Sequence, residues 1–167
     1  GRRIDTGSSD DRSRLGEAIH ASIAADLATP SRPLDMTEVA AILKRMQAGE
    51  GVDAAALHHQ LGALRSWLAT RWPDAIPVVE LPVARATSDG QHVQGRTDLV
   101  LRTSTGWILM DHKSTPQGRD QGGDLATTYA GQLAAYRDVL QAASGLHVEE
   151  MWLILPVAGA ALQVEVG

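Results

Sequence analysis

The chain has 167 residues and a formal net charge of −5, with 44% hydrophobic and 21% charged side chains. These values suit one soluble domain, and no apolar run approaches the ~20 residues that cross a bilayer. With no membrane segment and no signal-peptide pattern, we expect a cytoplasmic protein. The chain has no cysteine, which excludes disulfides, thiolate zinc sites and iron–sulfur clusters. The acidic balance argues against a free-standing nucleic-acid binder, because duplex affinity comes largely from neutralised phosphates.

The N-terminal part is predicted to be a linker followed by a helix. Residues 1–13 are polar, contain Gly and Ser, and lack periodicity, so they are a linker and a candidate for disorder. From Arg14 to Leu27, apolar residues recur at four-residue steps, which predicts an amphipathic helix. His20 lies beside this stripe, one turn after Gly16, and a glycine there lets the helix approach a neighbouring sheet. From the residues alone, His20 is either a histidine at the edge of a core face or a group within reach of a nearby site.

The rest of the chain divides into a helical part and a sheet. Helical spacing over 35–47 and 53–70 completes an N-terminal helical elaboration spanning 14–72. The remaining sheet core, 76–166, is predicted to contain five strands and one long helix. The strands are expected at 76–87, from about 91 onwards, at 106–113, at 149–156 and at 160–166, and the helix at 124–143. We therefore predict an α/β fold, in which helices flank a mixed central sheet of about five strands. The long helix crosses between the third and fourth strands, and 14–167 forms a single domain.

The stretch from Gly95 to Lys113, GRTDLVLRTSTGWILMDHK, predicts a β-hairpin with charged residues where a core is expected. Both apolar runs are nearly continuous, as in a sheet that is covered on both faces. Side chains alternate along a strand, so Asp111 and Lys113 share a face and His112 points the other way, away from any site on that face.

The register of this hairpin depends on its turn. A two-residue loop at Ser104-Thr105 would set Asp98 opposite Asp111, and a loop at Thr105-Gly106 would set it opposite Lys113. Both registers place the three charged residues on one face, although a three-residue loop with a bulge would shift the pairing by one position.

Two carboxylates facing each other across a strand pair repel, so a positive group is expected between them. Lys113 helps, and a divalent cation fits better, because carboxylate oxygens are ligands that Mg²⁺ and Mn²⁺ prefer. The alternative is a surface hairpin whose charges are solvated, as in a protein-interaction domain.

Five short motifs occur in one order along the chain. They are GxxxH (Gly16 to His20), an acidic strand residue (Glu80), GxxD (Gly95 to Asp98), DxK (Asp111 to Lys113) and QxxxY (Gln132 to Tyr136). This series resembles the PD-(D/E)XK nuclease superfamily, whose core is restriction-endonuclease-like. More narrowly, it resembles the RecB-like branch, the nuclease module of RecB and AddA-type helicase-nucleases. The similarity covers roughly residues 14 to 166. Because there is no cysteine, the chain resembles the relatives without an iron–sulfur cluster.

The resemblance implies roles for particular residues. Asp98, Asp111 and Lys113 would be catalytic, and Mg²⁺ or Mn²⁺ would be held by His20, the two aspartates and the main-chain carbonyl of His112. Glu80 is a further candidate ligand, and the alternative for it is an edge-strand glutamate that faces water. Candidates for binding DNA or positioning the site are Gln132, Tyr136 and Arg96; the alternative for the first two is a polar helix stripe with a tyrosine at the core edge.

The resemblance also implies a biological setting. We expect a DNA nuclease domain, of the exonuclease type, in a helicase-nuclease that processes double-strand-break ends for recombinational repair. Its partners would be a DNA strand or end fed by a helicase domain of the same parent chain, and a second helicase-nuclease subunit. A chain that starts at Gly1 without methionine fits a piece of a longer protein. The competing expectation is a catalytically inactive, nuclease-like module that binds DNA ends or acts as a scaffold.

Overall fold

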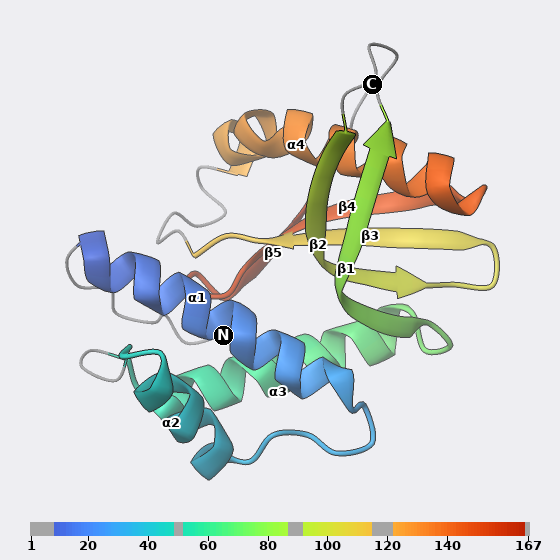
Figure 1. Ribbon diagram of the computed structural model, residues 1–167. Coiled ribbons are helices and arrows are strands. Elements are labelled where there is room, and N and C mark those ends of the chain that lie inside the picture. Colours follow the sequence, from blue (N-terminus) through green and yellow to red (C-terminus); the bar gives the residue numbers. More distant parts are fainter. Residues whose placement is uncertain (1–8, 49–51, 87–91, 115–121, 166–167) are drawn as a thin grey trace.

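The fold is a mixed five-stranded sheet with helices on both faces (Figure 1). The structure is a computed structural model, and it describes residues 9–48, 52–86, 92–114 and 122–165. The elements in chain order are α1 (Ser9–Ala28), α2 (Met36–Arg45), α3 (Ala54–Arg71), β1 (Ile76–Ala86), β2 (His92–Arg102), β3 (Gly106–His112), α4 (Gly122–Ser144), β4 (His147–Leu155) and β5 (Ala160–Gln163). None of the helices in these ranges combines the length and apolar character needed to span a bilayer.

Helix α1 confirms the predicted stripe and extends it. Leu15, Ile19, Ile23 and Leu27 are all buried. The helix begins at Ser9 rather than Arg14, so residues 9–13 of the predicted linker are helical. Residues 1–8, the rest of the predicted linker, lie outside the described part.

Two capped helices complete the N-terminal layer. Asp35 caps α2 in a capping box with Glu38, and Asp53 caps α3 by accepting a hydrogen bond from the main-chain nitrogen of Ala55. Asp26 near the end of α1 is almost completely buried, where it forms an ion pair with Arg65 of α3 and accepts a hydrogen bond from Leu34 N. Arg65 is therefore a structural residue that fixes α1 against α3.

The strand order is β1-β2-β3-β4-β5. β3 and β4 pair in parallel, and all other neighbours pair antiparallel. A parallel pair needs a crossover connection, and α4 supplies it, as predicted. β1 is an edge strand, which explains how it accommodates Pro82.

Two apolar cores cover the sheet, one on each face. Alternate residues of β3 serve alternate cores: Ile108 and Met110 pack towards α1, α2 and α3, whereas Leu109 packs towards α4 through Leu133 and Leu140. The nearly continuous apolar run of β3 is therefore explained by burial on both sides.

The Asp26–Arg65 pair gives a stability prediction. Arg65→Gln should lower the free energy of unfolding by about 3 kcal/mol, because it leaves the buried Asp26 carboxylate without its partner charge. Arg32→Gln is the matched control, since Arg32 forms an exposed pair with Glu38 and should cost less than about 1 kcal/mol. Equal losses in urea unfolding of the two variants would contradict this assignment.

Candidate active site

The site lies where β2 and β3 separate. The last ladder pair between them is Leu99 with Met110, so the register continued by one position sets Asp98 opposite Asp111. This is the register expected for a turn at Ser104-Thr105. No ladder pair forms at that level. Instead, Asp98 Oδ2 accepts a hydrogen bond of 2.8 Å from the main-chain nitrogen of His112, so the carboxylate fills the gap between the diverging strands.

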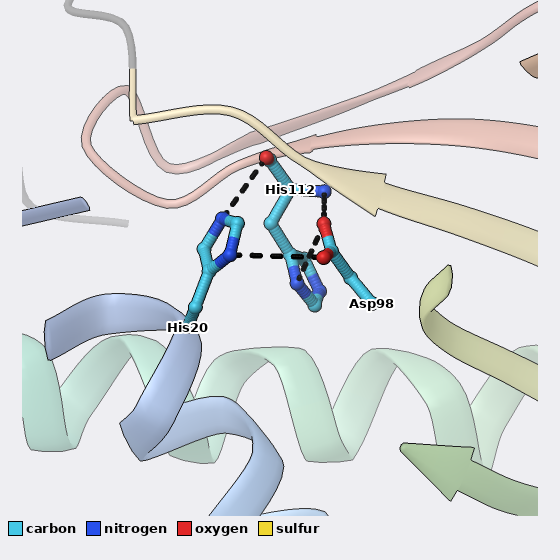
Figure 2. Close-up of side chains that lie close together, drawn as sticks. All are labelled: His20, Asp98 and His112. Carbon is cyan, nitrogen blue, oxygen red and sulfur yellow. Dashed lines mark hydrogen bonds and ion pairs between the residues drawn. The ribbon is translucent and has the colours of Figure 1, made fainter. Parts of the chain in front are cut away.

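Helix α1 brings His20 to this gap, as Figure 2 shows. His20 Nε2 lies 3.1 Å from the carbonyl oxygen of His112, and His20 Nδ1 lies 3.7 Å from Asp98 Oδ1. The approach is close: a Cβ atom built on Gly16 would lie 2.6 Å from Ser114 Oγ, just beyond β3. Gly16 therefore permits the contact that the GxxxH spacing suggested, and three predicted ligand groups come together here.

Asp111 and Lys113 form the other half of the site. The Asp111 side chain is only 6% exposed, and Lys113 Nζ lies 2.8 Å from its Oδ2 atom. The Lys113 ammonium is the partner of this buried oxygen, and no further hydrogen-bond donor reaches it from the described residues. Burial raises the pKa of Asp111 to about 6; Lys113 opposes this increase and the neighbouring Asp98 adds to it. The alternative prediction, a surface hairpin whose charges are solvated, is therefore wrong, because Asp111 is buried.

The imidazole of His112 is closer to the site than strand alternation suggested. Its side chain does point to the face opposite Asp111, but its Nδ1 atom lies 3.7 Å from Asp98 Oδ2 and its ring centre lies 5.5 Å from that of His20. The expectation that this ring lies away from the site was wrong, because Asp98 occupies the gap between the strands and is reached from both faces. Burial lowers the pKa of His112 to about 4, so the ring is neutral at pH 7. Its buried Nε2 atom has no hydrogen-bond partner among the described residues.

Helix α4 contributes both residues of the predicted QxxxY pair. Lys113 Nζ donates a 3.2 Å hydrogen bond to Gln132 Oε1. Tyr136 packs on β2, where a Cβ atom built on Gly95 would lie 3.0 Å from its ring. The pair therefore reaches the GxxD and DxK motifs; its contact with DNA stays a prediction.

Sequence reasoning missed one residue of this helix. The ammonium of Lys113 lies 4.8 Å from the ring centre of Tyr129. Tyr129 precedes Gln132 by three residues and Tyr136 by seven, and this helical spacing is the signal that could have identified it.

Glu80 lies in the neighbouring strand β1 at the level of Asp98. Pairing stops there, between the pairs Val79–Leu99 and Leu81–Thr97, and Glu80 has a positive φ of 50°. Its side chain is 55% exposed and faces Arg96, with 3.5 Å between Oε1 and Nη1. His20, Asp98 and His112 form a group of ligand atoms within 4.8 Å of one another, and neither Asp111 nor Glu80 belongs to it. A cation ligand role for Glu80 and a DNA role for Arg96 stay predictions.

Comparison with known families places this site in context. The sequence profile of the PD-(D/E)XK nuclease superfamily matches residues 2–165, so the chain belongs to that superfamily. A comparison with curated proteins finds no match. A solved structure described as "Crystal structure of SSO0001" is similar over 95% of this chain and 78% of that chain, at 16% identity and a TM-score of 0.38. A TM-score of this size does not establish a common fold by itself.

The donor set fits the divalent metal ions that PD-(D/E)XK nucleases use. Asp111 Oδ2 is a buried oxygen that meets only the Lys113 ammonium among the described residues, and Asp98 presents a second carboxylate at the same gap. The His112 carbonyl and the imidazole of His20 add an oxygen and a nitrogen. Hard oxygens with one or two imidazoles suit Mg²⁺ and Mn²⁺. With no cysteine in the chain, an iron–sulfur cluster held by thiolates is excluded.

The raised pKa of Asp111 gives a pH prediction for metal-free protein. Its folded pKa of about 6 exceeds the ordinary value of 3.8, so the group stabilises the fold at low pH and this contribution is lost as pH rises through 6. Asp111→Asn does not titrate. Between about pH 5 and pH 8, wild type should therefore lose on the order of 1 kcal/mol relative to the variant. Urea unfolding in chelator at both pH values measures this difference. A difference that is constant across that range would show that Asp111 is ionised throughout.

Proposed function

We propose that this chain is a metal-dependent DNA nuclease domain that hydrolyses phosphodiester bonds. The observation that carries the proposal is the gap between β2 and β3, where Asp98 neighbours the buried Asp111 and the Asp111 Oδ2 atom meets the ammonium of Lys113. A purely structural role does not account for it, because burying such a carboxylate pair costs free energy that an apolar pair would not.

His20, Asp98, Asp111 and the main-chain carbonyl of His112 would hold Mg²⁺ or Mn²⁺. When bound, such an ion acidifies a water molecule and neutralises charge on the scissile phosphate. Lys113 can orient that water and stabilise the negative charge that develops on the phosphate, since its ammonium is fixed 2.8 Å from Asp111. The two aspartates would thus bind the cation, and Lys113 would act on the water molecule and the phosphate. Glu80 would serve a second cation.

The DNA strand would approach past α4 and β2. Gln132 already contacts Lys113, Tyr136 lies on Gly95, and Arg96 is exposed on the same strand as Asp98. The net charge of −5 predicts weak DNA binding by this domain alone. A helicase domain in the same parent chain would supply the strand at high effective concentration. We accordingly propose a RecB-like exonuclease role in processing double-strand-break ends for recombinational repair, with a second helicase-nuclease subunit as partner.

Cleavage of linear DNA with Mg²⁺ or Mn²⁺ tests this proposal. Lys113→Ala should reduce the cleavage rate by about 10²-fold or more, because charge stabilisation in the transition state is lost. Lys44→Ala is the matched control, since Lys44 is exposed on α2, and it should cut like wild type. Equal cutting by wild type and Lys113→Ala would reject the site.

Metal binding is measured separately by calorimetry with Mn²⁺. Asp98→Asn should abolish binding, because it removes a ligand charge, whereas Lys113→Ala should keep it. A wild type that binds Mn²⁺ but does not cut DNA in any form would favour the inactive, DNA-end-binding alternative.

A further inference from the structure

The residue missed by sequence reasoning, Tyr129, lies directly against the proposed catalytic lysine. We propose that Tyr129 is a positioning residue, whose ring face holds the Lys113 ammonium in place when Asp111 is bound to a cation. This inference rests on the proposed nuclease function and adds a residue to it.

The Lys113 ammonium has three partners among the described residues. It lies 2.8 Å from Asp111 Oδ2, 3.2 Å from Gln132 Oε1 and 4.8 Å from the ring centre of Tyr129. The first partner lies on β3, two residues before Lys113, whereas the other two are one helical turn apart on α4. Helix α4 thus presents an amide oxygen and an aromatic face to one ammonium.

The partner on β3 is the one that metal binding weakens. Asp111 Oδ2 is a buried oxygen, and its partner among the described residues is the Lys113 ammonium. A carboxylate that ligates a divalent cation has less charge left to attract an ammonium. In the loaded site, the position of Lys113 therefore depends more on its contacts with α4.

Of the two contacts on α4, the one with Tyr129 is better fixed. Gln132 is exposed, so water competes for its amide oxygen. Tyr129 is half-buried and packs against the apolar core between α4 and the sheet. An aromatic ring attracts a cation through the negative charge of its face, and this attraction needs no hydroxyl group. Phenylalanine at position 129 should therefore keep the contact with the Lys113 ammonium, whereas an aliphatic side chain should lose it.

A series of substitutions at position 129 tests the electrostatic nature of the contact. Tyr129→Phe should cleave DNA like wild type. Tyr129→Leu, and replacement by pentafluorophenylalanine, which keeps the ring shape but removes its negative face, should each lower kcat by about threefold to thirtyfold. KM and Mn²⁺ affinity should be unchanged, since Tyr129 is not a ligand. Equal rates for the Phe and pentafluorophenylalanine proteins would overturn the proposal, and their thermal unfolding temperatures check that both are folded.

An NMR measurement tests the contact without relying on activity. The ε-methylene protons of Lys113, assigned with Lys113→Arg, should be shifted upfield by the ring of Tyr129 and lose this shift in Tyr129→Leu, with Mg²⁺ present as well as absent. An unchanged signal in Tyr129→Leu would overturn the proposal even if DNA is cut. If the wild type shows the shift but does not cut DNA, the positioning contact stands and the proposed nuclease function fails.

Discussion

The two aspartates at the gap between β2 and β3 impose the constraint on which the site depends. Asp98 and Asp111 are brought together by the hairpin register, and Asp111 is buried by the same two-sided packing that forms the sheet. A carboxylate in this position must be neutralised by a proton, an ammonium or a metal ion. The structure provides the ammonium of Lys113, and no further hydrogen-bond donor reaches Asp111 Oδ2 from the described residues. The other groups of the site serve to neutralise or hydrogen-bond these two carboxylates.

Each face of the sheet contributes a different kind of group. The face covered by α1 supplies the imidazoles of His20 and His112, which are nitrogen donors. The face covered by α4 supplies Asp111 and Lys113, with Gln132 against the lysine. Asp98 lies between them, since its carboxylate accepts the main-chain N–H of His112 and is within 3.7 Å of both rings. Asp98 thus has the two imidazoles on one side and the Asp111–Lys113 ion pair on the other.

Much of this site could be predicted from the sequence because it rests on local periodicity. Alternation along β3 put Asp111 and Lys113 on one face, the turn chemistry limited the hairpin to few registers, and four-residue spacing in α1 placed His20 beside a buried stripe. Helical spacing places Tyr129 on the same face of α4 as Gln132, but its contact with Lys113 and the contacts of the His112 ring could not be predicted from periodicity. They depend on where Asp98 leaves the ladder and on how α4 crosses the sheet, and these are tertiary arrangements. The start of α1 was missed because polar residues at 9–13 carry no apolar periodicity.

The freedom of Asp98 to fill the gap has a cause in the backbone on both sides of it. Towards β3, the ladder ends at Leu99 and Met110, so Asp98 has no paired residue there. Towards β1, the pairing is interrupted at Glu80, whose positive φ of 50° is unusual for a residue with a side chain. Such a conformation costs on the order of 1 kcal/mol or more and persists only where the surroundings impose it. Because the ladder is interrupted on both sides at one level, the carboxylate of Asp98 can turn into the sheet plane and meet groups from both faces. The unusual backbone of Glu80 therefore lies at the same level of the sheet as the carboxylate that accepts the His112 N–H.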